Sequence, residues 1–203
     1  MNRNLVDYCI GKLQTSEFYF KNDREIEVRN AVVFYTNFAG KPNQFGNATR
    51  NFNLAINEEV KNTLESDPSR KWNIHTVLDE ETQEPVLYYI NVKINMDNAY
   101  PPNIKLFTEY KGYRKTTTLD AETIGCLDGI AAESYDCTLN VYESKARPGH
   151  VTAYLRKLYV MQIKEPEFGG KYDDWEDPAP LALPMNGDPN IIDADVVEDP
   201  SVK

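Results

Sequence analysis

The sequence predicts a mainly β protein, built on a closed or partly closed β-barrel and followed by an acidic tail. Short runs rich in β-branched and aromatic residues alternate between polar and apolar positions, as half-buried strands do. Only two segments carry helix signals, and both are short. Six or more strands with two short helices favour a barrel with insertions. A β-sandwich is the main alternative.

The acidic excess is concentrated at the C-terminal end. The 203-residue chain has a net charge of -10, yet residues 1–164 hold 20 basic and 21 acidic side chains. Residues 165–203 hold 2 basic and 11 acidic side chains together with six prolines. Such a composition buries too little apolar surface to offset the entropy of ordering. We therefore predict a domain over residues 1–166 and a disordered acidic, proline-rich tail over residues 167–203.

Several classes of protein are excluded or disfavoured by composition. No apolar run approaches the roughly 18 residues that a membrane-spanning helix needs, and the first residues lack the apolar block of a secretory signal. Three widely spaced cysteines, Cys9, Cys126 and Cys137, predict neither a disulfide framework nor a metal site. We expect a cytoplasmic protein without membrane association.

The first strands of the predicted barrel precede a short helix. Residues 26–35 are rich in β-branched and aromatic side chains, and residues 37–47 contain the Gly, Pro and Asn of a loop. Residues 50–56 alternate strictly, which places Phe52, Leu54 and Ile56 on one face. Asn57 can then cap a helix that reaches about Leu64.

The later elements follow the same reasoning. Alternation predicts strands over residues 72–77, 86–94 and 104–107, and two long strands over about 131–142 and 151–163. Asp120 is a suitable first residue for a short helix that ends near Leu127.

Common catalytic constellations are missing from the sequence. There is no glycine-rich phosphate-binding loop, and His75 and His150 have no partners in a recognisable motif. Paired carboxylates such as Glu58-Glu59 are typical of solvated surfaces. We therefore expect a protein that is not an enzyme and that needs no cofactor and no metal ion.

Aromatic side chains are interleaved with basic ones at several places. Residues 110–115 combine two tyrosines with three cations, and residues 154–159 repeat the mixture. Proteins bind single-stranded nucleic acid with aromatic faces that stack on bases and with Lys and Arg that follow the phosphates. Many of the 13 tyrosines and eight phenylalanines must fill the core instead. The candidate DNA-binding residues are Phe38, Lys41, Phe45, Arg50, Phe52, Lys93, Tyr110, Lys111, Tyr113, Arg114, Lys115 and Arg156.

Several motifs resemble those of a family of phage single-stranded DNA-binding proteins. The opening block is Tyr35-Thr36-Asn37-Phe38-Ala39-Gly40, then Phe45, then Arg50-Asn51-Phe52-Asn53-Leu54-Ala55-Ile56. Similar features follow at Asn91-Val92-Lys93, Tyr100-Pro101-Pro102-Asn103-Ile104, Leu127-Asp128 and residues 153–160. The glycine before the Arg-Asn-Phe block departs from the family's pattern, because it is displaced to Gly46. The tail also lacks the final acidic run closed by an aromatic residue that bacterial tails have.

The resemblance implies an OB-like five-stranded barrel with added strands that coats single-stranded DNA during replication or recombination. It also implies an acidic tail that recruits replication or recombination proteins or competes with DNA. The alternative is a phage inhibitor that binds a host DNA-handling or defence protein through its acidic surface. A carbohydrate-binding barrel is a weaker possibility, because sugar sites do not need interleaved cations. Homo-oligomerisation and the choice between DNA and RNA stay open.

Overall fold

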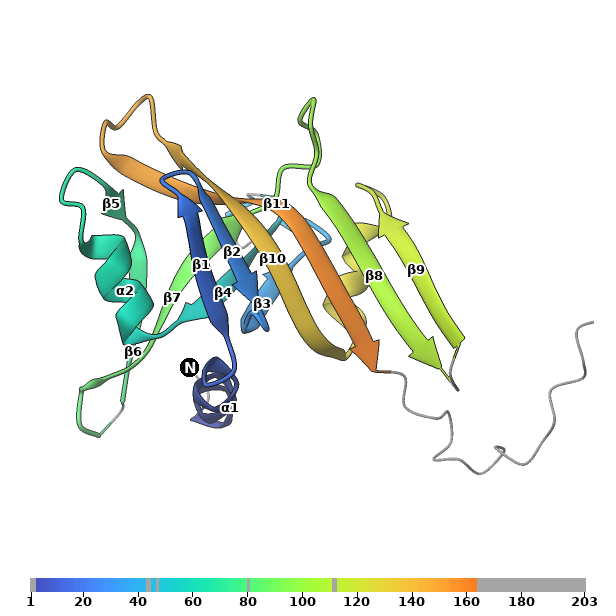
Figure 1. Cartoon of the computed structure of the whole chain (residues 1–203), viewed down its shortest axis with the longest axis horizontal. Helices are drawn as coiled ribbons and strands as arrows, with labels where there is room; N and C mark the ends of the chain where they lie inside the picture. The colour runs from blue at the N-terminus through green and yellow to red at the C-terminus, as the bar shows by residue number, and fades with distance from the viewer. Residues whose placement is uncertain (1–2, 43–44, 47, 80, 111–112, 164–203) are drawn as a thin grey trace, which may run out of the picture. The chain divides into compact units, whose positions relative to one another are not determined.

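The structure is a computed structural model that describes residues 3–163 except 43–44, 47, 80 and 111–112 (Figure 1). Eleven strands of this part join in one sheet, which confirms the predicted mainly β class. The predicted tail over residues 167–203 lies outside the described residues, so its disorder stays a prediction. None of the helices in the described part is long and apolar enough to cross a membrane.

The elements follow one another in the order shown in Figure 1. They are α1 (Arg3–Leu13), β1 (Glu17–Asn22), β2 (Glu25–Arg29), β3 (Val33–Asn37), β4 (Asn51–Ile56), α2 (Glu58–Glu65), β5 (Lys71–Trp72), β6 (Ile74–Leu78), β7 (Pro85–Lys93), β8 (Asn103–Tyr110), β9 (Tyr113–Leu119), the 3-10 helix η1 (Ile124–Gly129), β10 (Ala132–Glu143) and β11 (His150–Ile163).

A closed barrel is formed by β2 with β3, β4, β7, β11 and β10. β2 pairs with β10, and β3 pairs with β4, so the bent segment β2–β3 joins the two ends of the sheet. The hydrogen bonds from Ala31 N to Tyr135 O (2.7 Å) and from Ala55 N to Val32 O (2.9 Å) bridge the bend. β7 and β11 are parallel, and the other neighbours in the barrel are antiparallel. With the bent segment β2–β3 counted as one strand, this arrangement is compatible with the five-stranded OB barrel that the resemblance implies.

The bend corrects the prediction of one continuous strand over residues 26–35. Asn30 has a φ of 48°, in the left-handed region that Asn tolerates better than most residues. The backbone therefore turns at this position, and its two halves pair with different partners. Sequence alternation on both sides of the bend carries no signal of the turn itself.

Beyond the barrel, β1, β5 and β6 pair with β2, β11 and β7, and β8 and β9 extend the sheet beside β11. β7 lies beside the first half of β11, where Val92 is opposite Ala153, and β8 lies beside the second half, from Asn103 opposite Lys157 onward. β9 pairs with β8 as a hairpin (Figure 1). Between β7 and β8, residues 94–102 leave the sheet as a loop.

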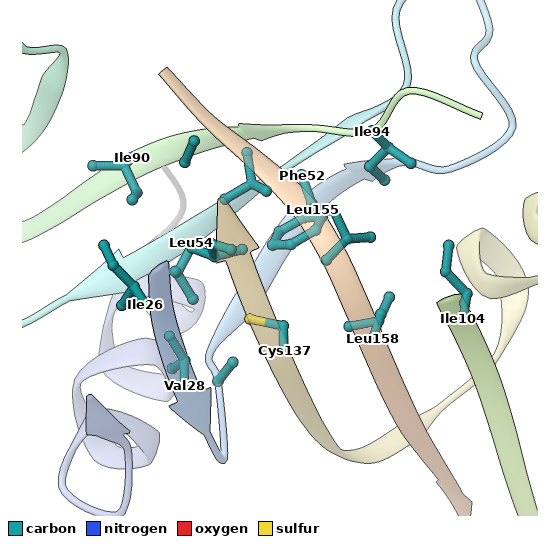
Figure 2. Packing of buried hydrophobic residues seen from close by; sticks show 14 of the residues in the cluster. Ile26, Val28, Phe52, Leu54, Ile90, Ile94, Ile104, Cys137, Leu155 and Leu158 are labelled. Carbon is teal, nitrogen blue, oxygen red and sulfur yellow. The ribbon is translucent and has the colours of Figure 1, made fainter. Parts of the chain in front are cut away.

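The main core fills the barrel (Figure 2). Side chains labelled there come from β2 (Ile26, Val28), β4 (Phe52, Leu54), β7 (Ile90), β10 (Cys137) and β11 (Leu155, Leu158). Burial raises the pKa of the Cys137 thiol to about 12, which keeps it protonated and apolar in the core.

α1 covers part of the outer surface of the barrel and was missed by the sequence analysis. Its buried residues Val6 and Cys9 pack in a second cluster with Phe34, Ala55 and Leu87. Ala55 therefore faces a helix and not solvent. The short apolar stripe of α1 and the absence of acidic residues in its first turn explain the weak signal.

The two predicted helices had different outcomes. α2 is confirmed, with Val60 N donating to the Asn57 side chain at 2.8 Å. Asp120 instead begins a turn, because its carboxylate accepts from the Thr123 hydroxyl (2.8 Å) and two backbone N–H groups. These bonds, led by that from Thr123, lower the pKa of Asp120. The 3-10 helix η1 begins only at Ile124.

Candidate nucleic-acid interface

A groove of about 560 Å³ opens on the outer face of β10 and β11, beside the loop 94–102. Its lining combines three tyrosines with two cations and several asparagines. We call it the tyrosine groove and define it by Tyr100, Tyr142, Tyr154, Arg156 and Lys157. Aromatic and basic side chains on one concave surface are the combination that single-stranded nucleic acid requires.

Strand alternation places the tyrosines of the sheet on the outside. On β11, Leu155 and Leu158 are buried in the barrel core, so Tyr154 points to the opposite face. On β10, Val141 is buried and Tyr142 is 57% exposed. The Tyr142 and Tyr154 rings meet edge to face, with centroids 5.5 Å apart and an interplanar angle of 87°.

A β-bulge brings two adjacent cations to this face. Leu139 of β10 is opposite Leu155 of β11, and the residue before it, Thr138, is opposite Lys157. Arg156 has no opposite residue in this register, so it is an extra residue in β11. Arg156 and Lys157 are both exposed, although strict alternation would turn one of them inward. The bulge therefore doubles the positive charge at the groove without disturbing Leu155 and Leu158.

A row of polar side chains continues the groove across the barrel. Residues opposite one another in a sheet share a face. Lys93 of β7 lies between Asn51 of β4 and Tyr154 of β11, and Tyr154 lies opposite Asn140 of β10. This register joins Lys93 to the tyrosine groove.

Arg156 has a carboxylate partner at the edge of the groove. Its guanidinium forms an ion pair with Glu25 of β2, and the two side chains are 48% and 28% exposed. An exposed ion pair contributes little net free energy, about 0–1 kcal/mol. A competing anion can therefore replace Glu25 as the partner of Arg156 at little cost in free energy.

The loop between β3 and β4 is held at its base by what we call the loop clamp, formed by residues 37–40, Arg50 and Asp128. The Asp128 carboxylate accepts from Phe38 N (3.0 Å) and Ala39 N (2.9 Å). Arg50 donates through Nε to Phe38 O (3.0 Å) and through Nη2 to Ala121 O (2.8 Å). Asn37 also bonds the backbone of Lys41 through both atoms of its amide.

Glycine is required inside the loop clamp. Gly40 has a φ of 69°, and a Cβ at this position would lie 3.0 Å from Cγ of Arg50. The Asn-Phe-x-Gly and Arg-Asn-Phe blocks and the Leu127-Asp128 pair therefore form one structural unit. This unit organises the loop that carries Lys41 and Phe45, both of which are exposed.

Three of the predicted DNA-binding residues have structural positions instead. Phe38 and Phe52 are fully buried, with ring centroids 5.8 Å apart, so their faces are not available to bases. Strand alternation and the loop clamp direct both rings inward. The guanidinium of Arg50 is half-buried and bound to backbone carbonyl groups.

The other predicted residues are distributed over three places. Lys93 and Arg156 lie at the tyrosine groove, and Lys41 and Phe45 lie on the clamped loop. Arg114 and Lys115 are exposed on β9, where Arg114 pairs with Glu109 at 3.0 Å. Lys111 and the side chains of Tyr110 and Tyr113 lie outside the described residues.

Five residues of the groove are not among the candidates predicted from the sequence: Tyr100, Asn140, Tyr142, Tyr154 and Lys157. Tyr154 and Lys157 belong to the aromatic–basic segment 154–159, which was recognised, although only Arg156 was chosen from it. Tyr100 lies in the recognised Tyr-Pro-Pro motif and is 90% exposed. For Asn140 and Tyr142 the available signal was their position on the polar side of a predicted strand.

Comparison with family models identifies a family for this chain. The family model described as "Putative phage ssDNA-binding domain" matches residues 15–198. The structure of the single-stranded DNA-binding protein from bacteriophage Enc34 with a C-terminal truncation is 13% identical; the match covers 75% of this chain and 98% of that chain, with a TM-score of 0.40. The Enc34 protein in complex with ssDNA is 13% identical, with coverages of 70% and 88% and a TM-score of 0.36.

A further similar structure is gp2.5, a single-stranded DNA-binding protein encoded by bacteriophage T7. It is 12% identical, with 84% of this chain and 99% of that chain covered and a TM-score of 0.31. No match was found among curated proteins. Because the family model spans most of the sequence, the chain belongs to the phage single-stranded DNA-binding domain family.

Proposed function

We propose that this protein binds single-stranded DNA without sequence preference in the tyrosine groove and coats it during replication or recombination. The observation that carries the proposal is the gathering of three tyrosines with Lys93, Arg156 and Lys157 on one outer face of the barrel. Family membership supports this function over the alternative of an inhibitor acting through its acidic surface.

Both base stacking and phosphate contacts would contribute to the free energy of binding. Exposed Tyr100 and the Tyr142–Tyr154 pair offer aromatic faces or edges to successive bases, each worth about 1–3 kcal/mol. The cations neutralise phosphates, which makes the affinity fall as salt rises. Every base has an aromatic face, so such a surface tolerates any sequence.

The clamped loop supplies a second set of contacts in this proposal. Lys41 and Phe45 are exposed on the loop, and the loop clamp holds the loop's base against η1. A preorganised loop loses less conformational entropy when it meets DNA. Arg50 and Asp128 therefore act as positioning residues and not as DNA contacts.

We also propose that the acidic segment over residues 165–203 recruits replication or recombination proteins. Its 11 acidic side chains against 2 basic ones support binding to basic partner surfaces. The same charge supports competition with DNA for the cations of the domain.

A fluorescence-quenching titration tests the proposed function. Poly-dT, poly-U and duplex DNA are added to the full-length protein at a low and a high salt concentration. We expect the tightest binding to single strands and a loss of affinity with salt. Preference for duplex DNA, or no binding, would contradict the proposal.

Paired variants locate the binding face. Tyr142→Ala with Tyr154→Ala should weaken poly-dT binding at least tenfold, from the roughly 1–3 kcal/mol that each stacked base contributes. The matched control is Tyr8→Ala, because Tyr8 on α1 is 52% exposed, close to the 57% of Tyr142, and lies outside the groove. Equal losses in both proteins would reject the groove as the binding face.

A further inference from the structure

A second aromatic–basic cluster lies on the outer face of the sheet extension. The Phe107 and Tyr159 rings meet edge to face, with centroids 5.7 Å apart. Lys105 Nζ lies 6.0 Å from the centroid of the Tyr159 ring. We call these three residues the extension cluster. Tyr159 is 37% exposed, so part of its ring is accessible to a ligand.

The extension cluster and the tyrosine groove belong to the same face of β11. Beyond the bulge, Leu158 and Val160 are buried, so Tyr159 points outward as Tyr154 does. Lys105 of β8 is directly opposite Tyr159. Four residues lie between the two tyrosines, and their partners on β10, Asn140 and Asp136, are four residues apart, a path of about 13 Å at roughly 3.3 Å per residue. Arg156 and Lys157 lie on this path.

The distribution of charge favours a DNA chain that leaves the tyrosine groove along β11 toward β8. On the β2 side, the tyrosine groove adjoins a second groove that is lined by four carboxylates and three arginines. Toward β8 the outer face carries Lys157, Lys105 and, on β9, Arg114. The carboxylates beside the path already have partners: Asp136, opposite Tyr159, accepts from Asn30 N, Glu109 is paired with Arg114, and Glu25 is paired with Arg156.

We infer that the extension cluster is a second base-stacking site for the same DNA strand, which would run along β11 from the tyrosine groove. The inference rests on the proposed function. It assigns to β8 a role that the barrel alone does not need, since β7 already completes the barrel. It also predicts that the protein occludes more nucleotides than the groove alone accommodates.

Oligonucleotides of two lengths test the inference with the full-length protein. OB folds cover roughly 4–16 nucleotides, so oligothymidines of about 5 and about 15 nucleotides separate one site from two. We expect Tyr159→Ala with Phe107→Ala to bind the short oligonucleotide like the wild type and the long one at least fivefold more weakly. Tyr159→Leu, which keeps an apolar side chain but no aromatic face, should give the same pattern and guards against misfolding.

Each outcome bears on a different statement. A wild-type protein that binds neither oligonucleotide would overturn the proposed function itself. The second site alone is overturned if the wild type binds both lengths equally tightly. It is also overturned if Tyr159→Leu binds the long oligonucleotide as tightly as the wild type does. If Tyr159→Leu weakens the binding of both lengths equally, the second site is overturned as well, because the extension cluster would then act through the tyrosine groove. A dimer formed through this face would appear as Tyr159-dependent self-association without DNA, which contradicts the inference.

Discussion

Arg156 has two alternative partners in this account: the Glu25 carboxylate and the phosphates that the tyrosine groove is proposed to bind. The bulge that exposes Arg156 also brings its guanidinium to Glu25 on β2. Charge on one residue is thereby partly neutralised when DNA is absent. We therefore propose that the affinity for DNA depends on an exchange of partners at Arg156 and not on the number of cations alone.

Removing the competing carboxylate should strengthen DNA binding. Glu25→Gln leaves a side chain of similar size but removes the negative charge that faces Arg156. We expect poly-dT affinity to rise by a few-fold at low salt, in line with the roughly 0–1 kcal/mol of an exposed ion pair, and the gain to vanish at high salt. Fluorescence titration at both salt concentrations measures the effect.

Glu27→Gln is the matched control for this change. Glu27 lies on the same strand, but it pairs with Lys21 (3.3 Å) and Arg29 (3.1 Å) and lines neither groove. The hydrogen bond with Lys21 lowers the pKa of Glu27, which keeps Glu27 charged at neutral pH. An equal gain in poly-dT affinity from Glu25→Gln and Glu27→Gln would show that only net charge matters and would contradict the proposed role of Arg156.

At the scale of elements, the loop clamp links three segments that are far apart in sequence. Asp128 in η1 holds the backbone of Phe38 and Ala39, and Gly125 of η1 lies so close to Ala39 that a Cβ would be 3.2 Å from the Ala39 Cβ. The loop between β3 and β4 is thus fixed by η1, which precedes β10. We expect the proposed DNA contacts of Lys41 and Phe45 to depend on this anchorage.

Asp128→Asn should loosen the loop. Each carboxylate oxygen accepts one backbone N–H, and an amide retains only one acceptor oxygen. We expect faster hydrogen exchange over residues 38–41, measured by mass spectrometry, and poly-dT binding weakened several-fold. Unchanged exchange in this segment would contradict the role of the loop clamp.

Asp79→Asn provides the control for charge. A single oxygen of Asp79 accepts from both Glu81 N and Thr82 N in the turn between β6 and β7, so the amide can keep both bonds. This variant loses the same charge without losing an acceptor atom. Its exchange over residues 38–41 should match that of the wild type.

The same scale shows how far sequence patterns predict elements. Strict alternation predicted β4 and β7 well, because one face of each strand is buried in the barrel. It did not predict the bend at Asn30, where one segment serves two partners. It also missed β9, whose run of threonines lies on a hairpin with little buried surface.

At the scale of the whole molecule, a net charge of -10 coexists with a DNA-binding surface because the charge is separated along the chain. The domain is nearly neutral, and its cations are gathered locally by strand register. Lys93 and Arg156 were predicted as individual residues, yet only the parallel pairing of β7 with β11 brings them together. A single sequence does not contain that register, so the shape of the groove could not be predicted.

Removal of residues 165–203 should tighten binding to poly-dT. The segment carries nine negative charges in excess, and we expect these charges to oppose the phosphates or to compete with them. The difference between the truncated and full-length proteins should be largest at low salt, because screening weakens the competition. Equal affinities at low salt would contradict the proposed competition.

The central claim is that DNA lies across the tyrosine groove. Photo-crosslinking of the full-length protein to oligothymidine substituted with 5-iodouracil, followed by peptide mapping, tests this claim most directly. We predict crosslinks at Tyr100, Tyr142 and Tyr154, which line the groove with Arg156. Crosslinks confined to α1 or to β6, with the three tyrosines unmodified, would contradict it.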